Sequence, residues 1–159
     1  MPVADAVVGG QRMRFDEPAR AGLPAHVTVL YPFLPVERIG AGTLDALRAL
    51  VSRHEGFEVV FGGFGRFPDA LWLAPEPAEP LRALTEAISG RWPEAPPYEG
   101  RFAEVVPHLT VASGQSSEVY AAVEGELGAG LPFAARVEEL QLMVSDGTRW
   151  HERAVFRLG

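Results

Sequence analysis

Two short triplets in the sequence combine a histidine and a threonine at the same spacing. His26 precedes Thr28 in HVTV, and His108 precedes Thr110 in HLTV. In a strand, side chains alternate between faces, so each histidine would share a face with its threonine. One neutral and one protonated histidine can move protons to and from a phosphodiester, while threonine hydroxyls donate to the phosphate oxygens where charge builds up. The pattern predicts metal-free phosphodiester chemistry by His26 and His108, with Thr28 and Thr110 binding the phosphate.

Other residues that could do chemistry give weaker patterns. His54 falls at the end of an expected helix, where the dipole favours a cation, and His151 lies near an expected exposed turn. A metal site that uses several of the four histidines stays open, but the usual H-x-H and H-x-x-x-H spacings are missing. The Gly-rich stretch FGGFGRF at 61–67 has no nucleotide-binding pattern and is interpreted as a hairpin turn.

Composition limits the classes of protein to consider. The 159 residues are enough for one domain with a real core. The net charge of −7, with arginine as the basic residue and no lysine, argues against gripping a long nucleic acid but leaves room for a small anionic ligand. With no cysteine, there is no disulfide scaffold or thiolate site. No secretory signal or long apolar run is evident, so we expect a cytoplasmic protein without a membrane partner.

Short elements of both kinds must position the triplets. Strands are expected over residues 3–8, 26–31, 57–61, 70–74, 102–112, 133–144 and 149–158. Helices are expected over 43–54, from Pro80 to Gly90, and after a cap at Ser116 or Ser117. Residues 9–24 and 92–101 are expected to be loops. Pro107 indicates an edge strand or a bulge, and a parity switch near Glu138 and Glu139 predicts a β-bulge.

The order of these elements repeats along the chain. A triplet is followed by a helix, a strand with Phe57 or Phe133, and a strand with Trp72 or Trp150. This repeat predicts one bilobal domain over 1–159, with halves of roughly 1–77 and 78–159, in which the two one-sided sheets bury each other's apolar faces. A single H-x-T triplet is more often structural, but two in matching positions of a repeat favour a functional role.

The two motifs also carry a family resemblance. HVTVLYPF at 26–33 and PHLTVA at 107–112 resemble the paired signatures of the 2H phosphoesterase superfamily, in particular its bacterial 2′-5′ RNA ligase-like branch. The stretches ALWLAPEP at 70–77 and PPYEG at 96–100 support the likeness, which covers most of the chain. The resemblance implies an α+β fold with two pseudo-twofold-related lobes, antiparallel sheets lining a central cleft and helices outside.

The resemblance also implies an activity. It assigns catalysis to His26 and His108 and phosphate binding to Thr28 and Thr110, with no metal or other cofactor. The activities of the family include opening 2′,3′-cyclic phosphates at RNA ends, hydrolysing small nucleotide phosphodiesters and reversible 2′-5′ RNA ligation. We therefore expect a monomeric cyclic phosphodiesterase that acts on a small nucleotide or an RNA terminus. The alternatives are a non-catalytic binder of such phosphates, a reversible 2′-5′ RNA ligase and a metal-dependent hydrolase.

Several further side chains could contact a nucleotide. Tyr31, Tyr98 and Trp150 could stack on a base or cap the cleft, although aromatic residues also dominate small cores. Arg149 could contact a phosphate or be an exposed arginine of the turn.

Overall fold

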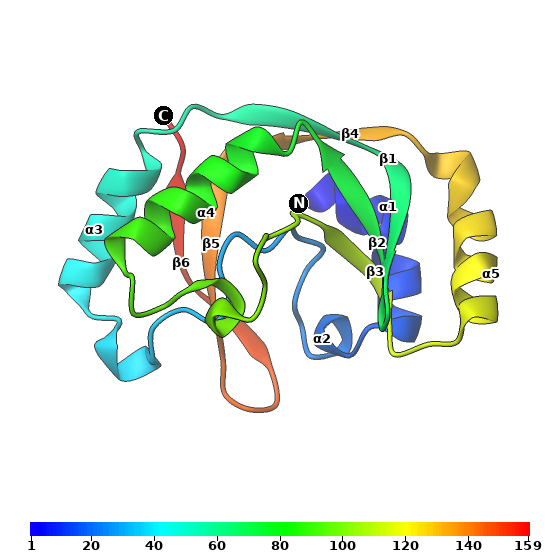
Figure 1. Ribbon diagram of the computed structural model, residues 1–159, viewed down its shortest axis with the longest axis horizontal. Helices are drawn as coiled ribbons and strands as arrows, with labels where there is room; N and C mark the ends of the chain where they lie inside the picture. Colours follow the sequence, from blue (N-terminus) through cyan, green and yellow to red (C-terminus); the bar gives the residue numbers. More distant parts are fainter.

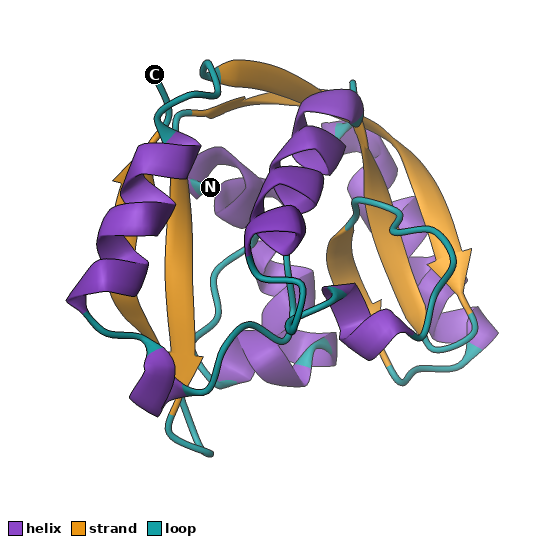
Figure 2. Cartoon of the chain, turned by 60° about the vertical axis from the view of Figure 1, so that its left-hand side comes forward, coloured by secondary structure: helices purple, strands orange, loops and turns teal.

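The computed structural model describes all residues, 1–159, and has an α+β fold built on two antiparallel sheets. The larger sheet has the strand order β3-β2-β1-β4, and the smaller one pairs β5 with β6. Figure 2 shows the strands of the two sheets on opposite sides of the molecule. In Figure 1, α3 lies outside the β5–β6 pair and α5 lies at the other end of the molecule. The expected fold class is confirmed.

The chain alternates between helices and strands along its length. The strands are β1 (Phe57–Phe67), β2 (Ala70–Glu76), β3 (Leu109–Ser113), β4 (Phe133–Val137), β5 (Glu139–Ser145) and β6 (Trp150–Arg157). The α-helices are α1 (Pro2–Phe15), α2 (Glu17–Arg20), α3 (Ala41–Val51), α4 (Glu79–Arg91) and α5 (Ser117–Leu127). Three short 3-10 turns, η1 (Val36–Arg38), η2 (Pro97–Gly100) and η3 (Gly128–Gly130), complete the chain.

The Gly-rich stretch 61–67 continues strand β1, so its prediction as a turn is wrong. The chain turns only at Pro68 and Asp69, because Phe67 pairs with Ala70 across a two-residue loop. The glycines are tolerated in the strand for local reasons. Gly62 is the extra residue of a bulge, and Gly65 lies directly under the ring of a tryptophan from β2.

Strand β3 is shorter than the expected strand over 102–112, because it begins only at Leu109, after Pro107. It lies at the edge of the larger sheet, as Pro107 indicated. Val111 is an extra residue between Thr110 and Ala112 in the pairing with β2. The edge position leaves the residues before β3 free to face a cavity.

The expected long strand over 133–144 is two strands that belong to different sheets. β4 pairs with β1 up to Val137, whereas β5 pairs with β6 from Glu139 onward. Between them, the carbonyl of Glu138 accepts a hydrogen bond from the Leu158 N–H at 2.9 Å. The parity switch in the sequence therefore marks a crossing between sheets, and the predicted bulge at this point is wrong. The hairpin around Asp146–Gly147 that leads to β6 is confirmed.

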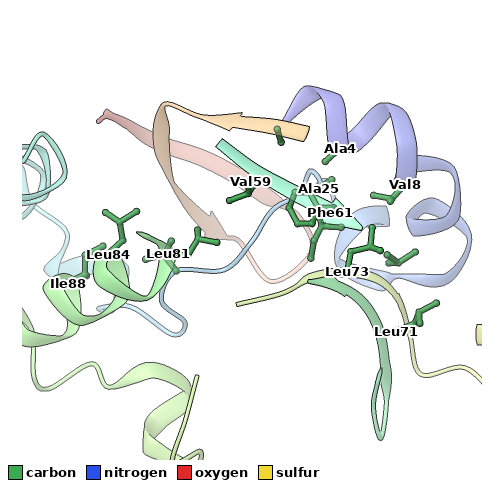
Figure 3. Packing of buried hydrophobic residues seen from close by; sticks show 14 of the residues in the cluster. Ala4, Val8, Ala25, Val59, Phe61, Leu71, Leu73, Leu81, Leu84 and Ile88 are labelled. Atoms are coloured by element: carbon green, nitrogen blue, oxygen red, sulfur yellow. The ribbon is translucent and has the colours of Figure 1, made fainter. Parts of the chain in front are cut away.

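The N-terminal segment is helical, so the strand expected over 3–8 and the loop expected over 9–24 are both wrong. Helix α1 starts with Pro2 in its first turn, a position that suits proline. Ala4 and Val8 are fully buried on it. Figure 3 shows these two side chains beside the apolar residues of β1 and β2. A short apolar run is compatible with either a strand or a buried helix, and tertiary packing decides here for the helix.

The three predicted helices are confirmed with small shifts at their ends. α4 buries Leu81, Leu84 and Ile88, which Figure 3 shows on one side of the helix. α5 is capped by Ser116, whose hydroxyl accepts from the Val119 N–H at 3.5 Å. α3 begins at Ala41 after Gly40, two residues before the expected cap at 43. No helix has the length and apolar character needed to cross a membrane.

Candidate active site

A cavity of about 1490 Å³ lies between the two sheets and receives both histidine triplets. His26, Thr28, His108 and Thr110 all line it. The segment 23–39, the start of β3 and the chain from 136 to 145 supply most of its walls. Residues that are 82 positions apart in the sequence thus face one shared space.

His26 is partly buried and oriented by its own backbone. Its Nδ1 lies 2.7 Å from the carbonyl oxygen of Pro24, two residues earlier. A carbonyl only accepts, so Nδ1 carries the hydrogen and donates it. In the neutral ring Nε2 is then left with a lone pair, and in the protonated ring Nε2 carries a second hydrogen.

His108 is held in the same way. Its Nδ1 lies 2.8 Å from the carbonyl oxygen of Val106, again two residues earlier. Two aromatic rings also hold the imidazole. The Phe67 ring meets it edge-on at 5.0 Å and 90°, and the Trp72 ring lies at 6.0 Å. A side chain on Gly65 would come within 2.2 Å of the Trp72 ring, so the glycine is what lets this ring lie where it does.

Burial is the main cause that lowers the pKa of both histidines below its usual value of 6.5. The backbone hydrogen bond to Pro24 or Val106 opposes this effect, because it stabilises the protonated ring. His26 is also near the Arg12 guanidinium, which lowers its pKa further, and the Asp16 carboxylate, which raises it. Both rings therefore favour the neutral form at pH 7 in the unliganded protein.

The segment 26–31 is not a strand, contrary to the prediction, because other elements occupy its hydrogen-bonding groups. Just before it, the Ala25 N–H donates to Asp5 Oδ1 at 2.7 Å. The Thr85 hydroxyl of α4 donates to the Val29 carbonyl at 2.7 Å. These contacts satisfy backbone groups that a neighbouring strand would otherwise have paired. They also fix the backbone on both sides of His26.

Thr28 and Thr110 are partly buried on the walls of the cavity. Thr110 pairs with Trp72 across the sheet, so both side chains lie on the same face. Leu109 is fully buried on the opposite face. In β3 the alternation expected from the sequence therefore holds, and it turns His108 and Thr110 toward the cavity.

An ion pair that was not predicted from the sequence lies beside this site. Arg12 donates from Nη2 to Asp16 Oδ2 at 2.8 Å, and the two side chains are each 3% exposed. Asp16 also accepts from the Ser113 hydroxyl at 3.0 Å, which ties α1 to the end of β3. Both charged residues line the cavity. The i,i+4 spacing of Arg12 and Asp16 was the available signal, but it has meaning only on a helix.

The other candidates divide into two groups. Tyr31, Tyr98 and Trp150 line the cavity, whereas His54, His151 and Arg149 do not. His151 instead bonds through Nε2 to Asp146 Oδ2 at 2.8 Å within the exposed hairpin. Nowhere in the structure do three or more His, Asp or Glu side chains form a group that could hold a metal ion.

A family model and two named bacterial proteins match this chain in sequence. The family model of the 2′-5′ RNA ligase superfamily matches residues 2–149. A Bacillus cereus protein named as a candidate phosphoesterase is 28% identical over 157 residues, covering 94% of this chain and 87% of its own. A Bacillus anthracis protein of the same name is 27% identical with the same coverage.

Solved structures resemble this one over almost the whole chain. Escherichia coli LigT complexed with 3′-AMP is 18% identical, with a TM-score of 0.62 and 99% of this chain and 92% of that chain covered. A Thermus thermophilus protein is 22% identical, with a TM-score of 0.57 and coverages of 98% and 91%. With the family model spanning nearly all residues, this chain belongs to the 2′-5′ RNA ligase superfamily of 2H phosphoesterases.

Proposed function

We propose that the protein is a metal-independent phosphoesterase that opens 2′,3′-cyclic phosphates of nucleotides or RNA ends. One observation carries the proposal: two histidines from distant segments make the same Nδ1 hydrogen bond to the backbone and line one cavity, each with a threonine two residues later. In addition, the relatives are named as phosphoesterases, and Escherichia coli LigT binds 3′-AMP.

The proposed reaction moves two protons and breaks one P–O bond. The neutral histidine accepts a proton at Nε2 from the attacking water. The water oxygen bonds to phosphorus, and the ring P–O bond breaks. The protonated histidine gives its Nε2 proton to the leaving ribose oxygen, so the product is a phosphate monoester. The hydroxyls of Thr28 and Thr110 donate to the non-bridging oxygens, where negative charge accumulates.

The two-histidine mechanism predicts how kcat/KM depends on pH. In the reactive form one histidine is protonated and the other is neutral, so activity falls when both are neutral. Because the pKa of each is lowered from 6.5, we expect a bell-shaped profile of kcat/KM with its maximum below pH 6.5.

The test is a substrate panel with matched variants. Cyclic nucleotides, 2′-5′ dinucleotides, RNA ends with a cyclic phosphate and pairs of RNA fragments for ligation are assayed in EDTA. We expect hydrolysis of cyclic phosphates, and a loss of about 10²–10⁴-fold in kcat/KM for His26→Ala and for His108→Ala. His54→Ala, at a histidine outside the cavity, is the control and should retain activity.

Each alternative predicts a different result in this panel. Affinity without product after long incubation would indicate a phosphate-binding protein, and joined fragments would indicate a ligase. Loss of turnover in EDTA, together with stoichiometric zinc in the purified protein, would indicate a metal enzyme. Full turnover by either histidine variant would refute the acid–base pair.

A further inference from the structure

Aromatic side chains from distant parts of the chain meet at the cavity. Tyr31 follows the first triplet, and Trp150 begins strand β6. Their ring centroids are 6.4 Å apart with an interplanar angle of 62°, and both residues line the cavity that holds the histidine triplets. Tyr31 is 52% exposed, so its ring contributes to the open part of the cavity wall rather than to the core.

Backbone hydrogen bonds anchor the segments that carry the two rings. The Trp150 N–H donates to the Ala21 carbonyl at 2.8 Å, which joins β6 to the segment before His26. The Tyr98 N–H donates to the Tyr31 carbonyl at 2.6 Å, and Tyr98 itself lines the cavity. Tyr98 has a φ of +50°, an uncommon backbone conformation for a non-glycine residue. Such conformations gather at ligand sites, where surrounding contacts enforce them.

Charge offers little to bind a phosphorylated ligand in this cavity. The arginines on its wall are already paired, Arg12 with Asp16 at 2.8 Å and Arg136 with Glu138 at 3.5 Å. The acidic residues that line the cavity outnumber them: Asp5, Asp16, Glu37, Glu138 and Glu139. The affinity for a nucleotide must therefore come largely from its uncharged part.

We propose that Tyr31 and Trp150 form a nucleobase subsite, with Tyr98 beside it, that selects nucleoside phosphates over phosphodiesters without a base. This inference rests on the proposed function, because the phosphate is placed between the two histidines. Every base presents a π-face to an aromatic ring, so stacking supplies affinity without demanding a particular base. The paired cations and excess carboxylates favour a ligand with a single negative charge, as in a cyclic phosphate, over a polyphosphate.

The experiment compares two substrates that share the reacting ring and differ only in the base. One is adenosine 2′,3′-cyclic phosphate, and the other is methyl β-D-ribofuranoside 2′,3′-cyclic phosphate, in which a methoxy group replaces the base. We expect the ratio of their kcat/KM values to fall by about 5- to 150-fold in Tyr31→Leu and in Trp150→Leu. Tyr31→Phe keeps a stacking ring and should keep the ratio near that of the wild type. Phe64→Leu removes a partly buried aromatic that does not line the cavity, and should leave the ratio unchanged.

The outcomes separate this inference from the proposed function. If both substrates are opened and neither leucine variant changes the ratio, the subsite is refuted and the phosphoesterase stands. If the wild type opens neither substrate, the proposed function fails. Binding of 3′-AMP, monitored by the quenching of tryptophan fluorescence, still tests the subsite. Quenching that is lost in Tyr31→Leu and retained in Tyr31→Phe supports stacking, whereas no quenching in the wild type overturns it.

Discussion

The buried pair of Arg12 and Asp16 gives the sharpest test of how helix α1 supports the cavity. The two side chains are each 3% exposed and joined at 2.8 Å. Arg12 also donates from Nη1 to the Leu23 carbonyl at 3.3 Å, and its Nε is buried without a partner. Asp16→Asn removes the negative charge and leaves the guanidinium without its counter-ion, although its side chain is only 3% exposed.

The loss of stability expected for Asp16→Asn follows from this burial. Breaking a buried ion pair by removing one partner costs about 3–5 kcal/mol. The whole domain is expected to be stable by about 5–15 kcal/mol, so the variant loses a large share of its stability. For a domain of this length each kcal/mol moves Tm by about 2–4 °C. We therefore expect Asp16→Asn to lower Tm by roughly 6–20 °C.

The chain offers a matched control in an exposed Arg–Asp pair on another helix. Arg48 and Asp45 of α3 are joined at 2.6 Å, but their side chains are 60% and 73% exposed. Asp45→Asn should cost no more than about 1 kcal/mol, because water screens the pair and solvates each partner. The double variant Arg12→Met/Asp16→Leu should recover most of the stability, since it removes both buried charges.

The assay is urea unfolding followed by circular dichroism, together with thermal melts. Equal losses in the free energy of unfolding for Asp16→Asn and Asp45→Asn would refute the reasoning, because burial of the ion pair would then make no difference to its contribution. A double variant as unstable as Asp16→Asn alone would also contradict it, because the penalty would not come from the stranded guanidinium.

Three further predictions concern the histidines, the strand under the tryptophan and a helix cap. His26 and His108, which line the cavity, each have a pKa below the unfolded value of 6.5. Below pH 6.5 the unfolded chain therefore binds more protons than the folded protein, so the free energy of unfolding should decrease as the pH falls. Thermal melts between pH 5 and 8 should show a smaller decrease for His26→Ala than for the wild type. Gly65→Ala should lower the free energy of unfolding by about 1–3 kcal/mol, because the added methyl group overpacks against Trp72. Gly63→Ala, whose methyl group would meet no neighbour, should not show this loss when the two variants are compared by urea unfolding. Ser116→Ala should cost about 0.5–1 kcal/mol by removing a cap, and an unchanged urea midpoint would contradict this.

The sequence predicted well those elements that depend on local signals. The Asp146–Gly147 turn, the cap at Ser116 and the apolar spacing of α4 are all encoded within a few residues. The same reasoning failed for α1 and for residues 26–31. The apolar run at 3–8 is too short to tell a strand from a helix. Residues 26–31 have strand-like composition, but their backbone is bonded by Thr85 and Tyr98 instead of a neighbouring strand.

For the site, the sequence alone determined the residue types that could move protons and their repeated spacing, in His26–Thr28 and His108–Thr110. Only the tertiary structure decided what surrounds them. The Arg12–Asp16 pair beside His26, the Phe67 and Trp72 rings on His108, and the contact of Tyr31 with Trp150 are its additions. A short motif follows from the geometry of neighbouring residues. The pKa of a histidine and the shape of a subsite depend instead on burial and on charges brought from far along the chain.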